Sequence, residues 1–212
     1  MRWIVVPAVV IALSTGCSSV VTGTPVADPL ALPTVTSSAA PQRMCAQVAP
    51  PMTAIATKGA DEPQLSIPQP GGWERRTGLD SDLIRFAMVN SGLAVDGIAA
   101  TAVVGLKRAE PGMSSAGEIL DFERQSLEYE LGATGVTLDK LTHCGFPAAI
   151  IDYQIPTINK TPPHPGRSLI VVVDVGSRTW VSTVTMQTMD AANPTYTTDS
   201  EEIIQGFAVK VP

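Results

Sequence analysis

The cysteines are the residues of this chain whose spacing points most directly to chemistry. Cys17 follows Leu13-Ser14-Thr15-Gly16 and an apolar run from Trp3 to Leu13, and Arg2 is the only charged residue before it. An apolar run of this length is typical of a signal peptide and is too short to cross a membrane as a helix. A small residue and a cysteine directly behind such a run match a bacterial lipobox, in which the cysteine carries the lipid. We therefore expect cleavage after residue 16, lipidation of Cys17, and a protein anchored to the extracytoplasmic face of the cell membrane.

One position departs from the usual lipobox. The leucine normally stands three residues before the cysteine, whereas that place holds Ser14 and Leu13 lies one residue further back. The alternative is an ordinary secretory signal, cut near Thr15-Gly16, that leaves Cys17 free.

The other two cysteines are candidates for a disulfide. With Cys17 assigned to lipid, Cys45 and Cys144 remain, and an exported protein meets an oxidising environment in which such a pair is expected to bridge. Closing a loop of about 100 residues corresponds to about 4–5 kcal/mol in the chain-entropy model. The alternative is that the two residues are unrelated buried thiols.

Ser114 is the one candidate nucleophile. It lies in Gly112-Met113-Ser114-Ser115-Ala116-Gly117, where the second glycine is one place too late for the G-x-S-x-G turn of a serine hydrolase. Ser115 and Glu118 instead match the S-x-x-E capping box that starts a helix. We therefore expect a helix cap here, and a serine hydrolase is only a remote alternative.

Neither a metal nor a cofactor is expected. His143 and His164 are the two histidines, and they lie far apart without zinc-ligand spacing. Asp80-Ser81-Asp82 begins like a calcium loop, but Arg85 and Phe86 stand where further ligands are needed. We predict no catalytic, cofactor-binding or metal-binding residues.

The charge of the chain limits its partners. Its 212 residues include 14 basic and 20 acidic side chains, for a formal net charge of −6. A chain this acidic is not expected to bind nucleic acid or an anionic membrane surface. Membrane contact must then come from the lipid, and a diacylated cysteine gives stable anchoring.

The composition divides the chain into three parts. Residues 1–16 form the expected signal peptide, and residues 17–61 form a tether rich in Pro, Ser, Thr and Ala, which cannot build a core. Residues 62–212 form the expected globular domain, for which we expect a monomer.

The periodicity of the domain predicts an α+β fold with a largely antiparallel sheet. A first helix should begin at the Ser115 cap and end at Gly132, and a second is indicated by Thr198 and Glu201 and should end near Gln205. A loop with four prolines is expected over 156–166. The expected strands cover residues 65–67, 83–89, 98–107, 136–141, 148–155, 168–174 and 179–187. The continuous apolar run Leu169 to Val173 predicts a central strand that is covered on both faces.

Phe122 and Tyr129 are the candidate ligand-binding residues. They lie on the side of the first helix away from its apolar stripe, where an aromatic pair could line an apolar groove. The simpler alternative is that the 156–166 loop or the second helix covers them.

The second half of the chain resembles a known family. The residues that carry the likeness are Gly145-Phe146-Pro147-Ala148, Ile150-Ile151, Val171 to Asp174, Trp180 to Gln187, Asp199-Ser200, Ile203-Ile204 and Gly206-Phe207, with Ile67-Pro68 and Gly72-Trp73 near the start. Together they resemble the LpqN/LpqT lipoproteins of mycobacteria and their relatives, over about residues 62–212. The resemblance implies a PsbP-like α-β-α sandwich without catalytic residues or metal. It also implies an envelope protein that binds an apolar or glycolipid ligand, or other proteins.

Two functions therefore remain open. The first is a non-enzymatic cell-envelope lipoprotein that binds a lipid or glycolipid outside the cytoplasmic membrane. The second is a surface adaptor or antigen that contacts envelope or surface proteins through loops such as Lys160 to Arg167. An apolar cavity beside Phe122 and Tyr129 would favour the first.

Overall fold

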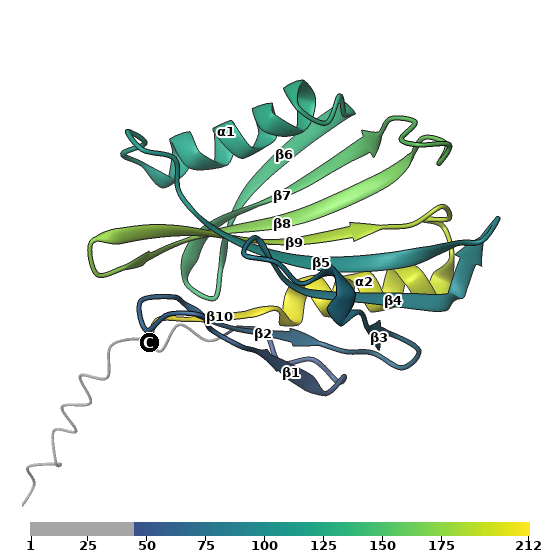
Figure 1. The fold of residues 1–212 in the computed structure, drawn as a ribbon, viewed down its shortest axis with the longest axis horizontal. Coiled ribbons are helices and arrows are strands. Elements are labelled where there is room, and N and C mark those ends of the chain that lie inside the picture. The colour runs from purple at the N-terminus through teal and green to yellow at the C-terminus, as the bar shows by residue number, and fades with distance from the viewer. Residues whose placement is uncertain (1–44) are drawn as a thin grey trace, which may run out of the picture. The chain divides into compact units, whose positions relative to one another are not determined.

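The computed structural model describes residues 45–212. The expected signal peptide, Cys17 and most of the expected tether lie outside these residues. The described part is an α+β domain with two antiparallel sheets and two α-helices (Figure 1). The predicted fold class is confirmed.

The large sheet has the strand order β3-β4-β5-β9-β8-β7-β6, and every neighbouring pair is antiparallel. Its strands are β3 (Glu74–Arg75), β4 (Ile84–Val95), β5 (Ile98–Arg108), β6 (Thr134–His143), β7 (Phe146–Ile155), β8 (His164–Val175) and β9 (Arg178–Gln187). Two-residue turns join β4 to β5 through Asp96-Gly97 and β6 to β7 through Cys144-Gly145, with positive φ at both residues of each turn. This is the conformation that matches the twist of a hairpin.

The strands are longer than their periodicity indicated, and the proline loop is shorter. β8 already begins at His164, so the predicted loop over 156–166 is wrong at its end. Pro165 pairs with β7 alone, because the pairing between β8 and β9 starts at Gly166. A proline is tolerated there since one side of the strand has no neighbour that needs its missing N–H.

A second, small sheet has the order β1-β2-β10. It consists of β1 (Met52–Ile55), β2 (Gln64–Pro68) and β10 (Ala208–Lys210), so it brings the two ends of the described chain together. The folded domain therefore begins before Glu62, the start that composition indicated. Residues 52–55 belong to a sheet rather than to a tether.

The two helices differ in how well the sequence predicted them. α1 (Ala116–Tyr129) has the predicted capping box, in which Ser115 accepts from the Glu118 backbone N–H. α2 (Pro194–Gly206) begins four residues before the predicted start at Thr198. Its cap is Asn193, whose side chain accepts from two backbone N–H groups, and a proline occupies the first helical position, where its missing N–H costs nothing. A short 3₁₀ helix, η1 (Thr77–Leu79), precedes β4.

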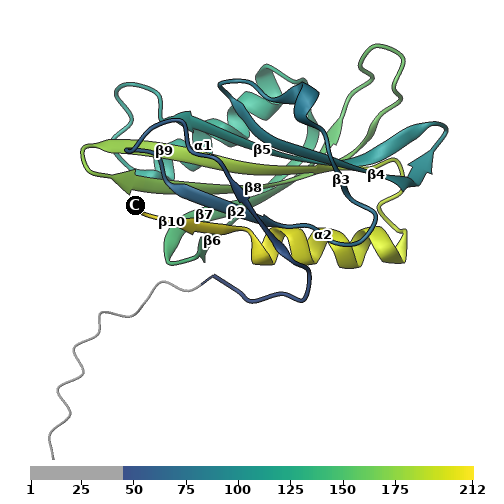
Figure 2. The ribbon, with the colours of Figure 1, turned by 60° about the horizontal axis from the view of Figure 1, so that its bottom comes forward.

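The large sheet separates two cores, which makes the domain an α-β-α sandwich. α1 packs on one face through Ile119 and Leu120, whereas α2 and the small sheet pack on the other (Figures 1 and 2). Leu169 of β8 lies in the core under α2 and Ile170 in the core under α1, so β8 is covered on both faces as predicted.

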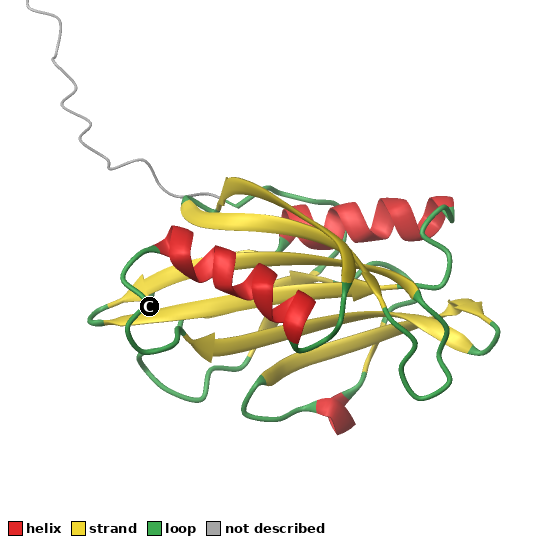
Figure 3. Ribbon diagram, turned by 90° about the horizontal axis from the view of Figure 1, so that it is seen from above, coloured by secondary structure: helices red, strands yellow, loops and turns green. Residues whose placement is uncertain are grey.

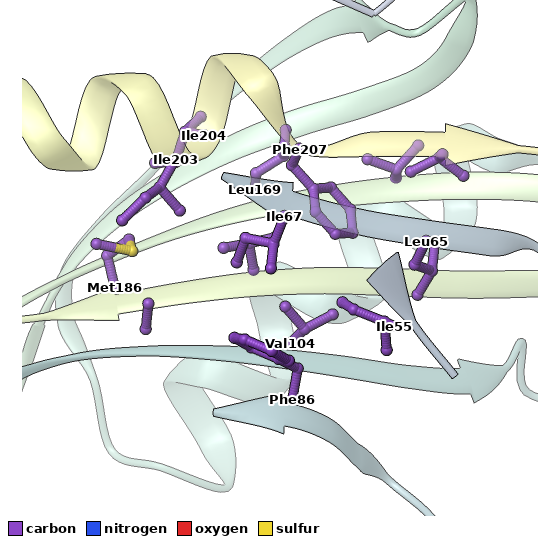
Figure 4. Packing of buried hydrophobic residues seen from close by; sticks show 14 of the residues in the cluster. Ile55, Leu65, Ile67, Phe86, Val104, Leu169, Met186, Ile203, Ile204 and Phe207 are labelled. Atoms are coloured by element: carbon purple, nitrogen blue, oxygen red, sulfur yellow. The ribbon is translucent and has the colours of Figure 1, made fainter. Parts of the chain in front are cut away.

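The core under α2 is the larger one. Figure 4 shows Ile203 and Phe207 pointing toward Ile67, Leu169 and Met186 from the sheets. All five side chains are fully buried. α2 contacts β2 of the small sheet and continues into β10, so helix and small sheet together close this face (Figure 2). Figure 3, seen from above, shows α1 on the other side, lying across strands of the large sheet.

Candidate functional site

The disulfide expected from the cysteine count is present in the structure. Cys45 is bonded to Cys144, which lies in the turn between β6 and β7 and contacts the core under α2. The bond attaches the start of the described chain to the far edge of the large sheet.

Ser114 has no histidine among its hydrogen-bond partners. Its hydroxyl donates to the Glu118 carboxylate, which also accepts from the backbone N–H groups of Ser114 and Ser115. These hydrogen bonds hold the pKa of Glu118 below its usual value.

The two histidines make local contacts. His143 Nε2 lies 2.6 Å from the Phe207 carbonyl and must donate to it, and burial lowers the pKa of His143 although this hydrogen bond opposes the shift. His164 Nδ1 lies 2.9 Å from the Pro162 carbonyl. Ser114 and the two histidines thus have separate hydrogen-bond partners, and Ser114 does not form the hydrogen bond to a histidine that the remote alternative, a serine hydrolase, would need.

The acidic residues that begin like a calcium loop form ion pairs instead. Asp80 binds Arg75 and Asp82 binds Lys58, both at 2.7 Å. Within residues 45–212 no group of three or more His, Cys, Asp or Glu side chains is placed to hold a metal ion.

The most distinctive surface lies beside α1. α1 packs mainly against β6, β7 and β8. It reaches β5 through the Lys107–Glu123 ion pair and covers Val181 of β9, but the rest of the same face of β5 and β9 has no helix over it. We call this surface the open face. Its residues are Thr101, Val103 and Gly105 of β5 and Thr183, Thr185 and Gln187 of β9, which face each other in register. All except Gly105 are half-buried.

Two hollows lie along the open face. The loop hollow, of about 280 Å³, is bounded by the loop between β7 and β8 and by Leu131 after α1. The helix hollow, of about 230 Å³, lies against Glu123 of α1 and Leu83 before β4. The pair Thr101–Gln187 lines the first and the neighbouring pair Val103–Thr185 lines the second, so the two hollows adjoin.

The lining of both hollows is amphipathic and nearly without net charge. The loop hollow combines Ile98, Ile155 and Ile158 with polar Asn159, Gln187 and His164. The helix hollow is lined by Ile84, Val103 and Val181 together with threonines. Its two charged residues, Lys107 and Glu123, pair with each other at 2.9 Å.

Three hydroxyl groups connect the core under α1 to the open face. The Tyr153 hydroxyl lies 3.2 Å from Ser168 Oγ, which lies 3.0 Å from Thr185 Oγ1. Burial raises the pKa of Tyr153, although its hydrogen bonds with the two other hydroxyls act in the opposite direction. Gly166 makes this arrangement possible, because a Cβ there would lie 2.7 Å from the Tyr153 ring.

Neither Phe122 nor Tyr129 lines either hollow. Lys107 Nζ, which belongs to the helix hollow, is 6.0 Å from the centre of the Phe122 ring. Tyr129 is 83% exposed, and α2 packs on the opposite face of the sheet, so neither the second helix nor a loop buries Tyr129. A role for this pair in ligand binding stays a prediction.

Sequence reasoning missed the open face and its three hydroxyls. The one signal in the sequence is Gly166 within a strand, since a glycine there often marks a close approach of another group. The role of Cys17 lies outside the described residues.

The comparisons with known proteins rest on structure alone. No family model matches the chain, and no curated protein sequence matches it. Among solved structures, that of LpqN from Mycobacterium tuberculosis, described as involved in cell envelope biogenesis, matches 76% of this chain and 91% of its own, with a TM-score of 0.59 and 16% identity.

The domain has an LpqN-like fold. Two further structures match 76% of this chain less well. A Pseudomonas aeruginosa protein of unknown function, described as a putative regulator, has a TM-score of 0.49 at 18% identity over 98% of its length. A point mutant of the protein Mog1 has a TM-score of 0.47 at 12% identity over 97% of its length. The likeness predicted from sequence is thus confirmed for the fold.

Within the described residues, no helix is both long and apolar enough to cross a membrane.

Proposed function

We propose that this chain is a non-enzymatic lipoprotein of the cell envelope, anchored through Cys17, whose domain binds a lipid or glycolipid on the open face. The LpqN-like fold supports an envelope role, since LpqN itself is described as acting in cell envelope biogenesis. The lipobox-like sequence before Cys17 supports the anchor and the extracytoplasmic location.

The observation that carries the proposal is the pair of adjoining hollows on a face without a covering helix. Together their volumes fall within the range of small-molecule sites, about 300–1,000 Å³. Apolar side chains interspersed with neutral hydroxyl and amide groups suit a molecule that is part hydrocarbon and part polar.

Native mass spectrometry of the mature chain carrying Cys17→Ser tests this proposal. We expect an added mass of lipid size, either co-purified from the cell envelope or after addition of lipid extract. Thr101→Trp should abolish it by filling the loop hollow. The matched control is Thr137→Trp on the exposed edge strand β6, which should bind like the parent. A bare mass for the parent under every condition would overturn the proposal.

The anchor is tested separately in cells. Wild-type protein should fractionate with membranes, and Cys17→Ser should release it, because the lipid supplies the membrane contact. Membrane association that is unchanged by this substitution would contradict lipidation at Cys17.

The second candidate is a protein-binding adaptor. It is favoured by the exposed large hydrophobic side chains of Ile158, in the loop between β7 and β8, and Tyr129, at the end of α1. In that case Thr101→Trp would leave function in cells intact, whereas Ile158→Asp or Tyr129→Asp would impair it.

A further inference from the structure

The three hydroxyl groups beside the open face have unequal access to solvent. Tyr153 and Ser168 are each about 4% exposed, whereas Thr185 is half-buried and lines the helix hollow. Tyr153 and Ser168 are therefore dependent on this cluster for their hydrogen bonds, and only Thr185 can reach a bound molecule.

This difference fixes the direction of the hydroxyl protons. Each hydroxyl has one proton to donate, and a buried proton without an acceptor costs about 1–3 kcal/mol. The two hydrogen bonds at 3.2 and 3.0 Å join Tyr153 to Ser168 and Ser168 to Thr185. Within these two bonds, a Thr185 that donated to Ser168 would leave the proton of Tyr153 or of Ser168 buried without an acceptor. The satisfied arrangement has Tyr153 donating to Ser168 and Ser168 donating to Thr185. The proton of Thr185 is then free to point into the hollow.

We propose that Thr185 is a specificity-determining residue that donates a hydrogen bond to an acceptor oxygen of the bound molecule, such as the ester or ether oxygen of an acylated or alkylated amphiphile. Tyr153 is a positioning residue, which acts through Ser168 by directing the Thr185 proton outward. This inference rests on the proposed binding of a lipid or glycolipid at the open face.

The surroundings of Thr185 make this donor selective. Ile84, Val103 and Val181 line the same hollow, and Lys107 and Glu123 are paired with each other. A hydrocarbon chain fits such a lining, and an oxygen acceptor placed within the chain or at its end finds its partner in Thr185. A pure hydrocarbon would gain nothing from the hydroxyl.

Two probes that differ in one feature test the proposal. Methyl octanoate carries an ester acceptor, and the n-alkane with the same number of heavy atoms carries none. Their affinities are measured by displacement of a fluorescent fatty probe from the mature Cys17→Ser chain. We expect Thr185→Val to weaken binding of the ester about fivefold, the usual effect of one hydrogen bond, and to leave alkane binding within about twofold.

Two further variants separate the hydrogen bond from packing. Thr185→Ser keeps the donor and should bind the ester like the parent. Tyr153→Phe keeps the ring over Gly166 but removes the hydroxyl that donates to Ser168. Ser168 can then accept from Thr185, so we expect ester binding to weaken by about twofold and alkane binding to stay unchanged. Equal effects of Thr185→Val on both probes, or no effect on the ester, would overturn the inference while leaving the proposed function intact. Failure of both probes to bind the parent would count against the proposed function instead.

The proton direction can be measured without any ligand. A neutron structure of the mature chain should show a deuteron on Ser168 Oγ directed at Thr185 Oγ1. A deuteron on Thr185 directed at Ser168 would overturn the inference whether or not a lipid binds.

Discussion

The two faces of the large sheet are built from the same strands but are covered to different extents. On β5, Ala100, Ala102 and Val104 point toward α2 and are fully buried, whereas the alternating Thr101 and Val103 on the other face are only half-buried. On β9 the contrast holds for Thr183, Thr185 and Gln187, whereas Val181 is fully buried under α1. Strand alternation alone would make the two faces equivalent, so the difference comes from what packs over them.

Simple dimensions explain the contrast. Neighbouring strands are about 4.8 Å apart and a helix with its side chains is about 10 Å wide, so one helix covers two to three strands. α1 covers mainly β6, β7 and β8 and leaves most of the rest of its face open. On the opposite face the small sheet closes the gap that α2 alone would leave. One face is therefore covered by α2 and the small sheet, whereas the other combines the core under α1 with the hollows of the open face.

The largest expected difference between the faces lies in their contribution to stability. Phe207→Ala in the core under α2 should lower the free energy of unfolding by about 3–5 kcal/mol, because it leaves a large cavity. Val103→Ala on the open face should cost about 1 kcal/mol or less. Urea unfolding of the mature Cys17→Ser chain measures both. Similar losses for the two variants would show that the faces are equally important for folding.

The Cys45–Cys144 disulfide, which packs against the core under α2, should also contribute to the stability of the domain. Replacing both Cys45 and Cys144 by alanine should cost about 2–4 kcal/mol, since the bond constrains the unfolded chain. Lipid binding at the open face should be unchanged in solutions where the variant is folded. Loss of binding with full stability would mean that the bond supports the ligand site directly.

The buried ion pair between Glu62 and Arg85 should make stability depend on pH. Burial by itself would raise the pKa of Glu62, but hydrogen bonds from Arg85 and from the Lys58 backbone outweigh it, and the pKa lies below the ordinary value of 4.5. The pair therefore contributes stability above pH 4.5, which is lost as the pH falls through the lowered pKa of the folded state.

The matched variant for this effect is Glu62→Gln. It should cost about 1.5–3 kcal/mol at neutral pH, the range for a hydrogen bond to a charged group, and the difference from the parent should shrink in acid. Urea unfolding at a series of pH values measures it. A difference that stays constant from pH 7 to below pH 4 would rule out the ion pair as the cause.

The smallest expected effect concerns the helix beside the open face. Ser115→Ala removes the cap of α1 and should cost about 1 kcal/mol. Because α1 forms one wall of the helix hollow, hydrogen exchange in its first turn should rise as well. Ser114→Ala is the control, since Ser115 keeps its capping role there, and equal effects of both variants would contradict the capping account.

The elements that the sequence predicted are those whose signals are local. The capping box and apolar stripe of α1 lie within one turn or a few turns, and the apolar run of β8 lies within one strand. The start of α2 was missed because Thr198 and Glu201 imitate a capping box inside a helix that Asn193 already caps. The short strands β1 and β10 carry too few residues for periodicity to reveal them.

The candidate site was harder to predict because it depends on long-range packing. Which strands α1 leaves uncovered follows from the order of the large sheet, not from any motif. The hydroxyl cluster likewise requires the pairing of Ser168 with Thr185 across two strands. Phe122 and Tyr129 were predicted from helix geometry alone, and neither lines a hollow.

The most direct test of the proposed binding site determines on which face of the large sheet a ligand binds. Methyl NMR spectra of the mature Cys17→Ser chain would be recorded with a spin-labelled fatty amphiphile. We predict the strongest broadening for Val103 of the open face and for Val181 and Leu131, which line the hollows, and weaker broadening for Ile67 and Ile203 in the core under α2. Stronger broadening in that core, or no broadening at all, would contradict the proposed site.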